Sequence, residues 1–150
     1  MGTVLVCACS AERAGHASQP PRLSESDAER LMLRADEIKL SPRAGKGGLA
    51  DVFGGRALQV LVAQAESLER RGLRIEERNT ARRLVFWDPR AGEAVLEVIA
   101  ERRIANRDDP NPGWVATVRQ WWAQLQFADG GWRIVDQQDL SPDRWRHPPG

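Results

Sequence analysis

The sequence is poor in the residues that most often carry catalysis or bind metals. Its 150 residues include two cysteines, two histidines and no tyrosine. Cys7 and Cys9 stand too close together to close a useful loop, and no further cysteine is present, which excludes a disulfide framework and a zinc site. His16 and His147 lie towards the two ends of the chain, so the usual general acids and bases are scarce. The sequence therefore predicts no metal and no cofactor, and it favours a protein that is not an enzyme.

Charge of one sign is also lacking. Lys and Arg together number 22 against 21 Asp and Glu, a net charge of +1, so no broad positive field favours nucleic acid or an anionic membrane. No stretch is long and apolar enough to cross a bilayer as a helix. The length suits one domain. We expect a segment at 1–22, a single domain at 23–140 and a proline-rich tail at 141–150.

Residues 1–10 are small and apolar and are followed by a polar run. Around Cys9, the sequence Leu-Val-Cys-Ala-Cys-Ser resembles a bacterial lipoprotein box. The resemblance implies a lipid on Cys9, a membrane anchor through that lipid alone, and a location outside the cytoplasm. The basic start and most of the apolar region of a signal peptide are missing, however. The alternative is an unstructured tail on a cytoplasmic protein, and the sequence leaves both open.

Two helices are predicted before residue 73. Ser26 and Glu29 have the spacing of a capping box, and apolar residues then recur every three or four positions over 27–39. A second amphipathic stretch covers 56–71, where Gly72 supplies a residue that ends helices. A short helical turn is expected at 49–53.

From Leu73 onward the apolar period shortens to two, which predicts strands. Residues 73–87 and 93–106 flank a turn at 88–92, and in the second stretch Ala94, Leu96, Val98 and Ala100 form an apolar face. Residues 114–140 hold four of the six tryptophans and break at Ala-Asp-Gly-Gly, which indicates a β-hairpin. Trp121 also fits a helical period, but the alternating face from Thr117 to Phe127 favours strand.

The predicted fold is α+β, with N-terminal helices packed on a curved antiparallel sheet of about four strands. Over 23–140 it resembles the nuclear transport factor 2-like superfamily, a cone-shaped fold. The residues that carry the resemblance lie in the last hairpin: Asp129, Gly130, Trp132, Arg133, Ile134, Val135 and Asp136. The chain also looks like the noncatalytic scaffold domain of chloroplast and cyanobacterial division proteins, through Val-Leu-Glu-Val at 95–98 and Arg-Gln-Trp at 119–121.

This resemblance implies a bacterial protein that is a noncatalytic binding or scaffold domain, and a homodimer through the open sheet face is a further alternative. We expect the tryptophans to bind an unknown protein partner or a small apolar ligand, with these site residues: Trp114, Trp121, Trp122, Trp132 and Arg119. The other alternative is an isomerase or cyclase that uses the cone interior. Its candidate acids are Glu97, Glu101 and Asp136, unless these carboxylates only pair with arginines on an exposed strand face.

Overall fold

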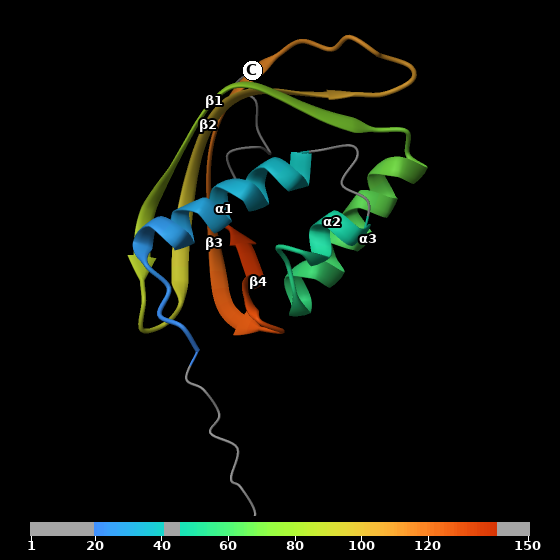
Figure 1. Ribbon diagram of the computed structural model, residues 1–150. Helices are drawn as coiled ribbons and strands as arrows, with labels where there is room; N and C mark the ends of the chain where they lie inside the picture. The colour runs from blue at the N-terminus through green and yellow to red at the C-terminus, as the bar shows by residue number, and fades with distance from the viewer. Residues whose placement is uncertain (1–19, 41–45, 141–150) are drawn as a thin grey trace, which may run out of the picture.

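The computed structural model describes residues 20–40 and 46–140, and it confirms an α+β fold with helices inside a curved antiparallel sheet. Its elements, in chain order, are α1 (Glu25–Leu40), α2 (Lys46–Ala50), α3 (Gly55–Arg70), β1 (Arg74–Asp88), β2 (Glu93–Ala105), β3 (Val115–Ala128) and β4 (Gly131–Asp139). In Figure 1 the sheet curls around α1. Helix α3 packs against β4, and α2 lies beside α3. The predicted lipid site at Cys9, both histidines and the tail at 141–150 lie outside the described residues.

The first helix starts two residues earlier than the capping box predicted. Ser24, rather than Ser26, caps α1: its hydroxyl accepts a hydrogen bond from the backbone N–H of Asp27 at 3.2 Å and donates one to the Asp27 carboxylate. The serine that precedes the first turn is the one whose oxygen can reach a free backbone amide. Behind the cap, the buried side of α1 carries Ala28, Met32 and Ala35, all without exposed surface.

The third helix ends where its glycine predicted. Gly72 follows α3 with a φ of +61°, and its amide donates to the carbonyl of Glu69, which closes the helix. The short helix α2 lies at Lys46–Ala50, before the expected 49–53 turn. The reason is that Phe53 is drawn into the sheet, where it forms a parallel bridge with Ile134 and is fully buried.

The sheet is a simple meander, in which β1, β2, β3 and β4 pair antiparallel in chain order. The tryptophan-rich stretch is a hairpin, as predicted, and Asp129 and Gly130 at its turn have φ values of 50° and 80°. Two successive residues with positive φ are what a tight two-residue turn needs to match the twist of the strands. Strand β1 is 15 residues long, close to the predicted 73–87, and its pairing with β2 has two register shifts, between Arg78 and Ala81 and between Leu84 and Phe86.

The two faces of the sheet differ sharply. We call the face that packs on the helices the inner face; Ala94, Leu96 and Val98 of β2 lie there without exposed surface, as the alternation predicted. The opposite, outer face has no helix over it among the described elements (Figure 1), and it exposes Phe86 and Ile99 by 47% and 45%. No partner chain is present, so the predicted homodimer through this face stays a prediction.

Candidate functional site

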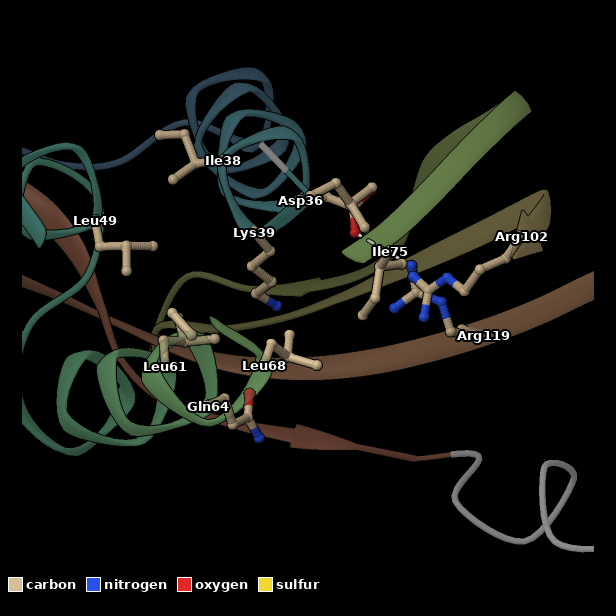
Figure 2. A pocket seen from close by; sticks show the side chains of 12 residues that line it. Asp36, Ile38, Lys39, Leu49, Leu61, Gln64, Leu68, Ile75, Arg102 and Arg119 are labelled. Carbon is tan, nitrogen blue, oxygen red and sulfur yellow. Dashed lines mark hydrogen bonds and ion pairs between the residues drawn. The ribbon is translucent and has the colours of Figure 1, made fainter. Parts of the chain in front are cut away.

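A hollow of about 190 Å³ lies between the inner face and the helices α1 and α3 (Figure 2). We call it the inner hollow. Its apolar lining comes from both helices and from Ile75 of β1, and it includes Ile38, Leu61 and Leu68. Its polar lining is Asp36, Lys39, Gln64, Arg102 and Arg119. Other depressions, such as one of about 400 Å³ beside Trp132, are more open grooves on the surface.

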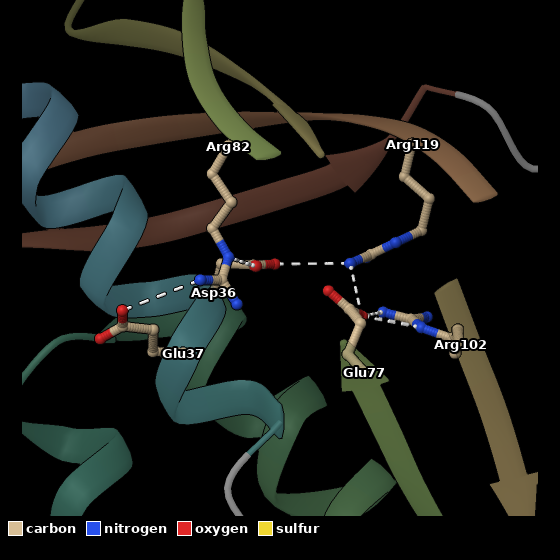
Figure 3. A network of polar contacts seen from close by, with 6 residues as sticks. All are labelled: Asp36, Glu37, Glu77, Arg82, Arg102 and Arg119. Carbon is tan, nitrogen blue, oxygen red and sulfur yellow. Dashed lines mark hydrogen bonds and ion pairs between the residues drawn. The ribbon is translucent and has the colours of Figure 1, made fainter. Parts of the chain in front are cut away.

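A buried ion-pair network forms one side of the inner hollow (Figure 3). Asp36 of α1 is only 1% exposed, and its carboxylate accepts a hydrogen bond from Nε of Arg82 at 2.7 Å. Its second oxygen lies 3.5 Å from a terminal nitrogen of Arg119. Since an unpaired carboxylate at this depth would be costly, these two arginines are what allow Asp36 to stay inside. They also join α1 to β1 and β3.

A second buried carboxylate, Glu77 of β1, extends the network. Its side chain is 2% exposed and accepts from Nε of Arg102 at 2.9 Å, while Arg119 approaches the same oxygen at 3.4 Å. Arg119 therefore bridges Asp36 and Glu77. Burial, together with the neighbouring charge of Arg102, lowers the pKa of Arg119 below its ordinary value.

Lys39 projects from the last turn of α1 towards the hollow, facing Leu61 and Gln64 of α3 (Figure 2). Its amine lies 3.3 Å from the ring centroid of Trp121 and 5.7 Å from that of Phe53. The pKa of Lys39 is lowered to about 7, chiefly by burial; Arg119 and Arg102 add to the lowering, whereas Asp36 and Asp139 act in the opposite direction. The indole face attracts the charged form of the amine. The Lys39 amine therefore loses its proton near neutral pH.

Positive charge exceeds negative charge around the inner hollow. The network joins two buried carboxylates, Asp36 and Glu77, to three guanidinium groups, those of Arg82, Arg102 and Arg119, and Lys39 adds a titratable fourth cation. Two buried donors, Nε of Arg119 and Nε1 of Trp121, have no hydrogen-bond partner among the described residues. Buried donors are nearly always satisfied by protein, water or ligand. The arrangement can accept a small anion.

The structure separates the predicted binding residues instead of gathering them. Arg119 and Trp121 lie on the inner face, where Trp121 is 3% exposed, and only these two belong to the hollow and its surroundings. Trp122 is adjacent in the strand and points to the outer face. Trp114 lies between the guanidinium groups of Arg78 and Arg103, at 4.0 and 4.7 Å.

Trp132 lies apart from these tryptophans. Its ring meets the edge of Phe127 with centroids 5.8 Å apart, beside the first turns of α1. The predicted five residues therefore do not form one site.

The carboxylates considered as catalytic acids do not face the interior. Glu97 lies on the outer face, where Arg83 and Gln120 donate to it at 2.8 and 2.9 Å. These hydrogen bonds, Gln120 first, lower the pKa of Glu97, whereas a proton-shuttling acid needs it raised. Glu101 pairs with Arg78 on the same face, and Asp136 lies 3.7 Å from Arg56. The exposed, arginine-paired alternative is the one the structure supports.

Sequence reasoning missed most of the residues around the hollow. Asp36 and Lys39 stand four positions after Met32 and Ala35, so both fall on the buried side of α1, and a charge on an apolar stripe was the available signal. Glu77 and Arg102 gave no such signal, because the sequence between Leu73 and Leu84 is almost continuously polar.

Within the described ranges, no group of three or more His, Cys, Asp or Glu side chains is placed to hold a metal ion. None of the helices in that part of the chain is long and apolar enough to span a membrane.

Comparison with known proteins supports the fold. The structure is similar to the intermembrane-space region of the chloroplast protein ARC6, with a TM-score of 0.66 and 19% identity over 80% of this chain and 98% of that one. A de novo designed β-sheet protein, solved in solution by NMR, aligns with a TM-score of 0.41 and 14% identity over 83% of this chain and 99% of that one. No family model and no curated protein matches the sequence.

Proposed function

We propose that this chain is a noncatalytic binding domain that takes an acidic group of a protein partner into the inner hollow. The excess of cations around the hollow is the observation that carries the proposal. An incoming carboxylate would find Arg119 and Lys39, which line the hollow, already positioned.

The size of the hollow supports a group of a partner over a whole small-molecule ligand. Ligand pockets usually measure about 300–1,000 Å³, and the inner hollow measures about 190 Å³. A carboxylate with its attached methylenes fits such a volume, while the rest of the partner would lie outside. Likeness in fold to a region of a chloroplast protein is consistent with a domain that binds without catalysis.

Two finer statements belong to the same proposal. We propose that the fold is of the nuclear transport factor 2-like kind, which the curved antiparallel sheet with helices on its inner face supports. A lipid on Cys9, with a bacterial and extracytoplasmic origin, remains a separate prediction. Binding at the inner hollow does not depend on it.

The test is calorimetric titration with glutarate, a dicarboxylate, against glutaramide, its neutral counterpart of the same length. We expect glutarate to bind and glutaramide not to bind, because only the former carries charge. Arg119→Gln and Lys39→Met should each weaken glutarate binding by about tenfold or more, as expected for a charge-assisted hydrogen bond worth roughly 1.5–3 kcal/mol.

The matched control is Arg78→Gln, which removes the same charge from the outer face, where Arg78 pairs with Glu101. It should leave the affinity for glutarate unchanged. Equal binding of glutaramide, or an equal loss in Arg78→Gln, would show that the hollow is not the binding site.

A further inference from the structure

We propose that Lys39 is a site of reversible modification by carbon dioxide: its amine forms a carbamate within the inner hollow, and the arginines there hold the product. This inference goes beyond the proposed binding function and does not require it. It rests on the place of one amine among the arginines and apolar side chains that line the same hollow.

The reaction needs only carbon dioxide and a neutral amine. The nitrogen lone pair of Lys39 attacks the carbon of carbon dioxide, an N–C bond forms, and one C=O electron pair moves onto oxygen. The nitrogen then releases a proton to solvent, which leaves a carbamate with one negative charge. With a pKa of about 7, roughly half of the Lys39 amines are neutral at pH 7, whereas an ordinary lysine would be neutral in only about one molecule in a few thousand.

The surroundings of Lys39 favour the product over the ammonium form. When the amine is neutral, three guanidinium groups pair with two buried carboxylates, Asp36 and Glu77, and with Glu37, which is 66% exposed, so a carbamate would supply a third buried negative charge. The charged groups that act on Lys39 are Asp36 of α1, Arg102 of β2, Arg119 of β3 and Asp139 of β4. The lining from α3 contributes Gln64, which is uncharged. Asp139 opposes the change, but it is exposed to solvent, which screens it.

Arg102 and Arg119 line the same hollow as Lys39 and can hold the carbamate. The amine of Lys39 lies over the ring of Trp121. The indole N–H of Trp121 and Nε of Arg119 both have no hydrogen-bond partner among the described residues. The negatively charged carbamate would move away from the negatively polarised face of the Trp121 ring. The flexible four-carbon stem of the lysine side chain allows this movement. The hollow has room for the three added atoms.

The experiment uses the full chain carrying Lys46→Arg, which leaves Lys39 as the only lysine, because the sequence has lysine at these two positions alone. Carbon-13 NMR in ¹³C-bicarbonate should show a carbamate resonance. It should vanish when Lys39→Met is added, while any signal from the N-terminal amine stays. Absence of the lysine signal in the folded Lys46→Arg protein, or its persistence with Lys39→Met, would overturn the proposal.

A second variant keeps the lysine and tests its surroundings. Arg119→Gln should lower carbamate occupancy by about tenfold through loss of a charge-assisted partner, and Arg78→Gln should not change it. At fixed dissolved carbon dioxide, the ratio of carbamate to free amine should rise about tenfold per pH unit above pH 7, because formation from the neutral amine releases one proton. An occupancy independent of both Arg119 and pH would contradict the assignment. If glutarate binds and no carbamate forms, the proposed function stands and this inference fails. If a carbamate forms and glutarate does not bind, this inference stands and the proposed function fails.

Discussion

The position of Lys39 in the folded protein is energetically unfavourable for a lysine. Its stem packs among apolar side chains of α1 and α3, and its amine lies on Trp121 with no carboxylate in direct contact among the described residues. Such a position costs free energy of folding that an apolar side chain of similar length would not cost. Retaining a cation there is easier to understand as a binding requirement than as a contribution to stability.

This cost predicts how stability depends on pH. The unfolded chain keeps the ordinary lysine pKa of 10.5, so between pH 7 and 10.5 the unfolded state binds more protons than the folded state. Stability contributed at Lys39 therefore rises with pH through this window, and the penalty is complete below pH 7. We expect Lys39→Met to raise the free energy of unfolding by about 1–3 kcal/mol at pH 7 and by progressively less towards pH 10.

Urea unfolding of both proteins at pH 7, 8.5 and 10 measures the difference. A gap between variant and wild type that stays constant over this range would mean that Lys39 does not titrate there.

At the scale of elements, Asp36 ties α1 to the sheet. Its carboxylate pairs with Arg82 of β1 and Arg119 of β3 while keeping only 1% exposure. Asp36→Asn should destabilise the fold by about 3 kcal/mol, because it removes the buried counter-charge nearest to Arg82 and one of the two that Arg119 bridges. Denaturant unfolding monitored by tryptophan fluorescence gives the value.

Glu37→Gln is the matched control. Glu37 is the next residue on α1 and also approaches Arg82, at 3.8 Å, but its side chain is 66% exposed. Its loss should change stability by no more than about 0.5 kcal/mol. Equal effects of the two substitutions would show that the buried network does not connect the helix to the sheet.

The elements also show what sequence patterns can and cannot predict. The hairpin at 114–140 and the apolar face of β2 follow from alternation and turn residues, which are local properties. The cap moved from Ser26 to Ser24 because both serines have an acidic residue three positions later. Site residues are harder, since Arg119 meets Asp36 across 83 positions in the sequence. Periodicity cannot show which charged side chains of a polar strand such as β1 will be paired and buried.

In the whole molecule, the two faces of the sheet differ in their chemistry. The inner face holds the cation-rich hollow, whereas the outer face carries exposed apolar residues between arginine–carboxylate pairs such as Arg83–Glu97. Trp121 and Trp122 mark the two surfaces, because adjacent residues of a strand point to opposite sides. We propose that acidic ligands bind on the inner face, on the side of Trp121.

The most direct test follows the indole N–H signals of the six tryptophans by ¹H–¹⁵N NMR while glutarate is added, with each signal assigned through a Trp→Phe variant. We expect the Trp121 signal to shift in a saturable manner and the signals of Trp114 and Trp122 to stay in place. A shift of Trp122 or Trp114 with an unmoved Trp121 would place the binding site away from the inner face and contradict binding in the inner hollow.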